Sequence, residues 1–216
     1  MILSEFINIF DQDIAPQYLR NEQAFDSQSH HGRLHILRCL YLAEYLCSSY
    51  EELGYDKIDR TKVFFPIAFH DIGRKGNDID LWEEDSYKIC LNYLVDSGLD
   101  QTPSEKIASS ILKKEPFDPI TQILYDVDVL DYMRFFTYDM YARSLFQDAR
   151  LKYFSKDDII ISHPKTSDQL RETAIQLALQ FAIKTENLSL SHNHNVISNK
   201  ISQSWMQIVN PIKLPE

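Results

Sequence analysis

The alternation of apolar and polar positions predicts helices through the first half of the chain. Over residues 33–50, leucines and tyrosines recur every three or four positions, and Gly54 follows as a helix stop. Asp59 is a suitable N-cap for a segment that is apolar nearly all round, passes through His70 and ends near Gly73. Because this second helix offers almost no polar face, we expect it to be buried.

The same periodicity predicts further helices along the rest of the chain. They cover residues 83–96, 102–112, 118–130, 138–153 and 167–187. Three consecutive isoleucines at 159–161 form the one stretch that favours a short β-strand. Residues 189–216 are rich in Ser, Asn and His and hold two prolines, so we expect a loosely ordered tail there.

The pattern therefore predicts an all-α, compact, single-domain helical bundle over residues 1–188, followed by the tail. Composition agrees, because the 216 residues include only five glycines. Average usage of about 7% would supply roughly three times as many. Neither a Walker loop nor a dinucleotide-binding glycine motif can be built from these five.

Charge and cysteine usage narrow the possible partners and location. With 32 acidic and 22 basic residues the formal charge is −10, so we expect no nucleic-acid polymer as a partner. Three cysteines without a close pair argue against a disulfide framework and favour a reducing, cytoplasmic location. No apolar run approaches the roughly 20 residues that span a bilayer, and no signal peptide is recognisable, so no membrane partner is expected.

A mixed set of histidines and carboxylates is the strongest candidate for chemistry. His70 and Asp71 end the most apolar predicted helix, where a buried carboxylate is costly unless a cation offsets its charge. His35 and Asp128 lie in two other predicted helices. Neighbouring helical positions project about 100° apart, so His70 and Asp71 could bind one ion only at a helix end. Two imidazoles and two carboxylates suit Mn, Fe, Co, Ni or Zn.

The order of these residues resembles the HD-domain phosphohydrolase superfamily. Three stretches between residues 29 and 134 are similar to its motifs: H-G-R-L-H-I-L-R over 31–38, A-F-H-D-I-G-R over 68–74 and D-V-D-V-L-D over 126–131. The resemblance implies an HD-type helical fold and metal-dependent hydrolysis of a phosphate ester or anhydride. The expected substrate is a small phosphorylated metabolite, with a nucleotide first. The metal ligands that it implies are His35, His70, Asp71 and Asp128, with Asp126 as the alternative to Asp128.

The sequence departs from the superfamily pattern at two places, and this affects the expected number of metal ions. Relatives of this kind often carry one further histidine about ten residues after the second stretch and another before the third. Here these neighbourhoods read W-E-E-D over 82–85 and L-K-K over 112–114, which favours one metal ion over two. The proton donor is left open among Glu83, Asp80 and Asp131.

Fixed cations are needed to hold the charge of a phosphoryl transition state. Arg74 is the first choice for this contact, because it directly follows the second stretch. Lys75 and Arg38 are the other nearby cations and are expected to help bind the substrate. His31 lies one helical turn before His35 and is expected to donate a hydrogen bond to substrate or leaving group.

The missing accessory histidines leave a second function open. The chain would then be a non-hydrolytic helical binding or regulatory module with a structural or vestigial metal site. Turnover of a phosphate ester separates the two functions. No pattern in the sequence predicts whether the chain pairs with itself.

Overall fold

The computed structural model describes residues 1–76, 82–114, 118–132, 134, 168–185, 188 and 190–209. These residues form an all-α fold, and no β-strand occurs among them. The predicted fold class is therefore confirmed. The helix predicted at 138–153 and the short strand predicted at 159–161 lie outside the described residues.

Three helical elements that we did not predict begin the chain. Helix α1 spans Leu3–Ile9, the π-helix η1 spans Phe10–Ile14, and α2 spans Ala15–Ala24. They pack on the core through buried apolar side chains that include Phe6, Phe10, Ile14 and Tyr18. The Tyr18 hydroxyl also donates a hydrogen bond of 3.0 Å to the carbonyl of Ala68, which ties α2 to the helix that carries His70.

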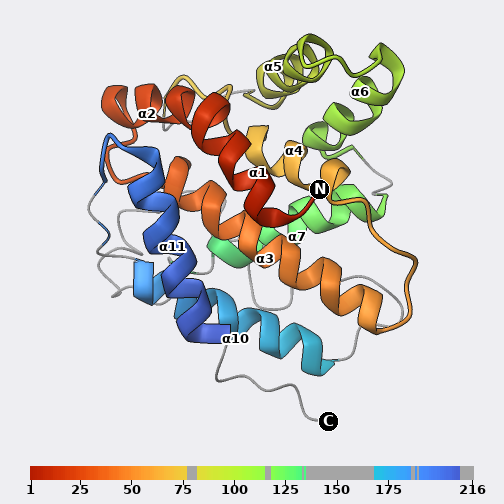
Figure 1. Cartoon of the computed structure of the whole chain (residues 1–216), viewed down its shortest axis with the longest axis vertical. Coiled ribbons are helices and arrows are strands. Elements are labelled where there is room, and N and C mark those ends of the chain that lie inside the picture. The colour runs from red at the N-terminus through yellow and green to blue at the C-terminus, as the bar shows by residue number, and fades with distance from the viewer. Residues whose placement is uncertain are drawn as a thin grey trace.

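The long helix α3, Arg33–Glu52, lies at the centre of the fold (Figure 1). It contacts α1, α2, α4, α7, α10 and α11, so side chains on several of its faces are buried in the core. Helix α4 spans Arg60–Phe69, and its N-cap Asp59 accepts a hydrogen bond of 3.0 Å from the Thr61 amide. Both helices lie where their apolar patterns predicted them.

The corner after α4 brings the chain into close contact with α5, Trp82–Asp96. The Gly73 amide donates a hydrogen bond of 2.9 Å to Ser86 Oγ. A Cβ atom at Gly73 would lie only 2.6 Å from the Ser86 backbone nitrogen and 2.7 Å from the Trp82 carbonyl oxygen. This approach requires glycine, and it fixes the end of α4 where His70 and Asp71 lie.

Three further elements complete the half of the fold that carries the predicted site. Helix α6 spans Gln101–Ala108 and continues as the 3₁₀-helix η2, Ser109–Leu112. Lys113 follows in the left-handed region, with φ of 46°. Helix α7 spans Pro119–Tyr132 and is capped by Asp118, whose carboxylate accepts a hydrogen bond of 2.7 Å from the Thr121 amide.

Within the segment 189–216, which composition suggested to be a loose tail, residues 194–209 form an ordered helix, and residues 210–216 lie outside the described residues. Helix α10 spans Asp168–Thr185 and α11 spans His194–Val209; the two pack together and against α3 (Figure 1). Helix α11 buries side chains at helical spacing: Ile197, Ile201, Trp205 and Ile208. The Trp205 ring lies 5.0 Å from the ring of Phe181. This apolar face overrides the polar composition of the segment.

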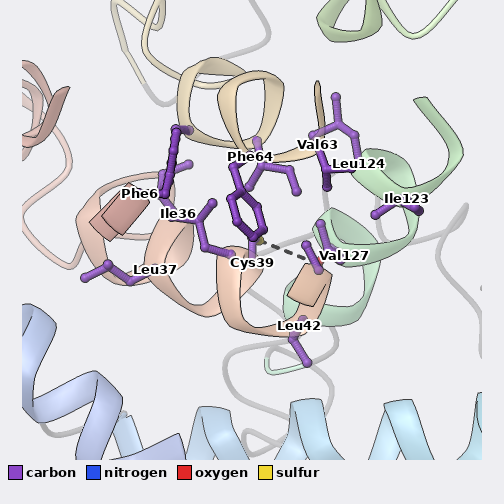
Figure 2. Close-up of a cluster of buried hydrophobic side chains, with 14 of the residues drawn as sticks. Phe6, Ile36, Leu37, Cys39, Leu42, Val63, Phe64, Ile123, Leu124 and Val127 are labelled. Atoms are coloured by element: carbon purple, nitrogen blue, oxygen red, sulfur yellow. Dashed lines mark hydrogen bonds between the residues drawn. The ribbon is translucent and has the colours of Figure 1, made fainter. Parts of the chain in front are cut away.

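Figure 2 shows how α3, α4 and α7 meet in the core. Phe64 of α4 lies over Cys39 of α3, beside Val127 of α7. The Cys39 thiol donates a hydrogen bond of 3.6 Å to the Val127 carbonyl. All three cysteines are buried and free. Because these helices carry His35, His70 and Asp128, their packing brings the predicted ligands within reach of one another.

Candidate active site

Four side chains predicted as metal ligands converge at the centre of this packing. The Nε2 atoms of His35 and His70 lie 3.2 Å apart. Asp71 Oδ2 lies 3.6 Å from His35 Nε2 and 3.5 Å from His70 Nε2. Asp128 Oδ1 lies 3.5 and 3.6 Å from the same two nitrogens. Both imidazoles therefore face the two carboxylates across a space of a few ångströms.

Hydrogen bonds on the far side of each ring fix the orientation of the two imidazoles. His35 Nδ1 donates a bond of 2.7 Å to Asp131 Oδ2, and His70 Nδ1 donates one of 2.7 Å to the Ile67 carbonyl. Each Nε2 atom is then left as the nitrogen that points to the cluster. Such outer partners are what hold metal-binding histidines in the correct tautomer.

The electrostatics of the cluster favour positive charge at its centre. Burial lowers the pKa of His35 to about 4. Burial also acts to lower the pKa of His70, but the neighbouring Asp71 and Asp128 carboxylates outweigh it and raise that pKa. The pKa of Asp71 is held well below its usual range, because the charges of His70 and Arg74 overcome the effect of burial. Burial also acts to raise the pKa of Asp128, but Lys113 and His70 outweigh it and hold that pKa well below its usual range, so two ionised carboxylates flank the imidazole pair.

Asp131, one of the three residues considered as proton donor, lies behind this cluster. Its contacts do not suit that role. Besides His35, it accepts hydrogen bonds of 2.5 and 3.1 Å from Arg38 and a further bond from Arg134. These cations outweigh burial and keep the pKa of the Asp131 carboxyl far below its usual range. A carboxylate held ionised in this way cannot serve as an acid, so its role is to position His35.

Two of the three predicted phosphate-binding cations point elsewhere. Arg38 is buried and committed to Asp131, with a further bond of 3.3 Å to Thr185 Oγ1. The Lys75 ammonium pairs with Asp85 at 2.5 Å, and its side chain is 79% exposed. Neither cation lies at the cluster, because Asp131 binds Arg38 behind it and Asp85 of α5 binds Lys75 at the surface.

Arg74 does lie at the cluster, as a partner of a predicted ligand. Its Nε donates a hydrogen bond of 3.0 Å to Asp71 Oδ1, and its guanidinium carbon lies 3.5 Å from the centre of the Trp82 ring. Its Nη1 is buried, with no hydrogen-bond partner in the described part of the chain. This geometry assigns Arg74 first to holding Asp71.

His31 enters the site from a short loop whose backbone is fixed by two buried acids. Asp26 accepts hydrogen bonds of 2.9 and 3.0 Å from the amides of His30 and His31. Glu22 accepts bonds from Ser29 Oγ and from the Arg33 side chain on the other side of the loop. His31 Nδ1 donates a bond of 3.0 Å to Asp71 Oδ2, and its side chain is 16% exposed. It therefore lies at the open side of the cluster.

Sequence reasoning missed two cations of the site, Lys113 and Arg134. Lys113 Nζ lies 2.6 Å from Asp128 Oδ2, and Arg134 Nη2 donates a bond of 2.5 Å to the His30 carbonyl. Burial would lower the pKa of Lys113, but Asp128, Asp71 and the half-buried Glu83 together raise it. The L-K-K stretch over 112–114 was the sequence signal for Lys113, but it was interpreted only as the absence of a histidine.

The remaining candidates lie outside the cluster. Asp126, the alternative to Asp128, is fully buried and accepts a hydrogen bond of 2.8 Å from Gln122. Its Oδ2 has no partner among the described residues, and burial raises its pKa to about 8. Glu83 contributes through the charge that it exerts on Lys113. Asp80 lies outside the described residues.

A groove of about 630 Å³ opens elsewhere on the surface, between the end of α3 and the beginnings of α4 and α7. Tyr50, Tyr55, Lys57, Lys62 and Lys106 are among its lining residues, and none of the clustered histidines or carboxylates is. The candidate active site is therefore defined by the convergence of reactive side chains and not by this groove.

An all-helical domain with a buried centre of histidines and carboxylates is the class of protein that these observations define. The family model of the SidE phosphodiesterase (PDE) domain matches residues 8–198, so the chain belongs to that family. No curated protein and no solved structure matches the chain. None of the described helices is both long and apolar enough to cross a bilayer.

The family match corrects one prediction and supports another. The identification with the HD-domain superfamily is wrong, because the chain matches a different family over most of its length. Short histidine and aspartate motifs are shared by unrelated families, which is how the resemblance arose. The predicted reaction class is confirmed at a coarser level, since membership indicates a phosphodiesterase that hydrolyses phosphate esters.

Proposed function

We propose that the chain hydrolyses a small phosphodiester at the cluster of His31, His35, His70, Asp71 and Asp128. The last four of these residues would hold one divalent transition-metal ion. The proposal rests on their donor atoms and is independent of the HD-domain resemblance. The nucleotide substrate and the cytoplasmic location both stay predictions.

The distances between donor atoms carry this proposal. Two ligands about 2.1 Å from one ion, at angles of roughly 90–110°, stand roughly 3.0–3.4 Å apart. The separations here are 3.2 to 3.6 Å, with each carboxylate oxygen near both imidazole nitrogens. His35, His70 and Asp71 also offer atoms that all lie within 4.8 Å of one another. This donor set suits a first-row transition metal.

A metal at such a site supplies Lewis acidity and a water of lowered pKa. The residues of the chain do the rest of the work. Asp131 and the Ile67 carbonyl hold the two imidazoles with Nε2 facing inward. His31 uses Nδ1 to bind Asp71, which leaves Nε2 as its nitrogen for a hydrogen bond to the substrate or leaving group.

Metal analysis and hydrolysis of a model phosphodiester test the proposal together. We expect the untagged chain to retain close to one equivalent of a transition metal and to hydrolyse bis(p-nitrophenyl) phosphate. Chelation should abolish turnover, and added Mn²⁺ or Zn²⁺ should restore it. A panel of cyclic and linear nucleotides then tests the nucleotide prediction.

Substitutions on α7 give a matched comparison. Asp128→Asn should lower both metal content and turnover by about 100-fold or more, since even outer-shell substitutions typically cost 10–100-fold. Asp126→Asn is the control, because Asp126 is buried two residues away and lies outside the cluster. Turnover that survives chelation and Asp128→Asn would overturn metal-dependent hydrolysis. Phosphodiester binding without turnover would support the binding-module alternative instead.

A further inference from the structure

Lys113 is nearer to solvent than the other cations around the cluster. Arg38 and Arg134 are buried against Asp131, and Arg74 is buried against Asp71 and Trp82. The side chains of Lys113 and Asp128 are 23% and 25% exposed, so this pair lies on the solvent side of the cluster. A substrate that approaches from solvent would meet the Lys113 ammonium before it met the buried guanidinium groups.

The backbone conformation at Lys113 is held by its surroundings. Its φ of 46° is unusual for a residue with a side chain, and such conformations persist where surrounding contacts hold them. The 3₁₀-helix η2 ends here, with the Lys113 amide bonded at 3.2 Å to the Ser110 carbonyl. This turn places Nζ 2.6 Å from Asp128 Oδ2, while Asp128 Oδ1 faces the two imidazoles.

The ammonium retains capacity to bind an anion. It carries three N–H donors, and Asp128 is its one hydrogen-bond partner in the described part of the chain. Lysine binds phosphate as a compact point charge. A non-bridging phosphoryl oxygen at the cluster would therefore meet a donor held at a fixed distance from a predicted metal ligand.

We propose that Lys113 binds the phosphoryl group of the substrate. Its Nζ would bridge Asp128 Oδ2 and a non-bridging oxygen of the phosphodiester. This inference rests on the proposed function in placing the substrate at the cluster. It assigns to Lys113 the charge-holding role that the sequence had given to Arg74, Lys75 and Arg38.

The neighbouring Lys114 provides a matched control. It has the same side chain one residue later, but it is 72% exposed and lies 3.9 Å from Glu84. We expect Lys113→Met to lower kcat/KM for bis(p-nitrophenyl) phosphate at least ten-fold and to weaken inhibition by inorganic phosphate to a similar extent. Lys113→Arg should recover part of both losses. Lys114→Met should behave like the wild type in both measurements.

Metal affinity separates substrate binding from a purely structural role. Removing a cation beside Asp128 should leave Mn²⁺ or Zn²⁺ affinity unchanged or make it tighter, because one repelling charge is lost. If Lys113→Met instead loses metal and activity together while Lys113→Arg keeps both, Lys113 merely positions Asp128 and the proposal is overturned. Unchanged turnover and unchanged phosphate inhibition in Lys113→Met would overturn it as well.

Phosphate binding also separates this proposal from the proposed function. A shift in melting temperature with inorganic phosphate needs neither turnover nor a particular metal. A wild type that binds phosphate without hydrolysing a diester would contradict the proposed function, and loss of the shift in Lys113→Met would still support the role of Lys113. A wild type with no phosphate-dependent shift would overturn the Lys113 proposal. Lys113→Gln replaces Lys113→Met if the latter fails to fold.

Discussion

The Nε2 atoms of His35 and His70 lie 3.2 Å apart, although each ring already uses Nδ1 for another hydrogen bond. A neutral imidazole that donates from Nδ1 presents a lone pair at Nε2. Two facing lone pairs repel each other unless a proton or a cation lies between or beside them. The arrangement therefore depends on positive charge at the cluster, which a proton on His70, whose pKa is raised by Asp71 and Asp128, or the proposed metal ion would supply.

Asp131 should be essential for this arrangement even though it does not face the cluster. Asp131→Asn keeps the shape of the side chain but leaves Arg38 and Arg134 without their shared counter-charge. Breaking a buried ion pair typically costs about 3–5 kcal/mol, so we expect a clear loss of stability in urea unfolding. Metal affinity, measured well below the melting temperature, should fall about 10–100-fold because His35 loses its anionic partner.

A second variant checks this interpretation of Asp131. Thr185→Val removes a hydroxyl partner of Arg38, at 3.3 Å, together with the hydrogen bonds that this hydroxyl donates to the Phe181 and Ala182 carbonyls, and it leaves Asp131 in place. It should leave metal affinity near the wild-type value. Equal metal affinity in Asp131→Asn and the wild type would contradict the positioning role.

A substitution at Cys39 tests which group of side chains would hold the proposed metal ion. Its Sγ lies 3.7 Å from His35 Nδ1, and His35, Cys39 and Asp131 form a second buried group that could bind an ion. The contacts of His35 Nδ1 and of the thiol are already explained by Asp131 and the Val127 carbonyl. We expect Cys39→Ala to retain metal and turnover, while core truncation lowers the free energy of unfolding by about 1 kcal/mol. Loss of metal in this variant, with the fold intact, would assign the ion to the second group.

The convergence of His35, His70 and Asp128 could be predicted because each lies in a strongly apolar helix. Apolar helices must pack together, so polar groups embedded in them are brought close to one another. The partners of Arg38 could not be predicted in the same way. Arg38 and Asp131 are 93 residues apart, and only the packing of α3 against α7 shows that they are neighbours.

The N-terminal helices were missed for a different reason. Phe6, Phe10, Ile14 and Tyr18 recur every four residues, so on a regular α-helix this series would drift by about 40° per step from one face. The π-helix Phe10–Ile14 has wider turns and keeps these side chains directed to the core. Each four-residue step taken alone fits the helical pattern, but the series as a whole leaves one face of a regular α-helix. Helix α11, by contrast, shows ordinary helical spacing that its polar composition obscured.

Gly73 should be required for both stability and activity. A Cβ atom there would lie 2.6 and 2.7 Å from backbone atoms of α5, which cannot move aside as a side chain can. We expect Gly73→Ala to cost about 1–3 kcal/mol in urea unfolding, as overpacking typically does. Since Asp71 and Arg74 flank this residue, turnover should fall as well.

The control for Gly73 is a glycine with open surroundings. Gly98 has φ of +91°, and a Cβ atom there would meet nothing within 4 Å. Gly98→Ala should cost about 1–2 kcal/mol through backbone strain alone and leave turnover unchanged. Equal turnover in Gly73→Ala and Gly98→Ala would contradict a role for the α4–α5 corner in the site.

Asp11 is not one of the cluster residues, and its ionisation should make the stability of the fold depend on pH. Burial raises the pKa of its carboxyl above the ordinary value of 3.8, although Ser198, at 2.6 Å, and the charge of Arg33 act in the opposite direction. The folded state therefore holds this proton more tightly than the unfolded state. Ionisation of Asp11 therefore lowers the stability of the fold. This loss begins as pH rises above about 4 and is complete above the raised pKa of Asp11.

Asp11→Asn removes this ionisation and can keep the acceptor for Ser198. We expect the variant to match the wild type near pH 3.5 and to exceed it by about 1 kcal/mol at pH 7, a typical size for one substitution. Urea unfolding at several pH values measures this difference. Asp96→Asn, at an exposed position of α5, should change stability by less than about 0.5 kcal/mol throughout. A constant difference between Asp11→Asn and the wild type from pH 3.5 to 7 would show that Asp11 is ionised alike in the folded and unfolded states.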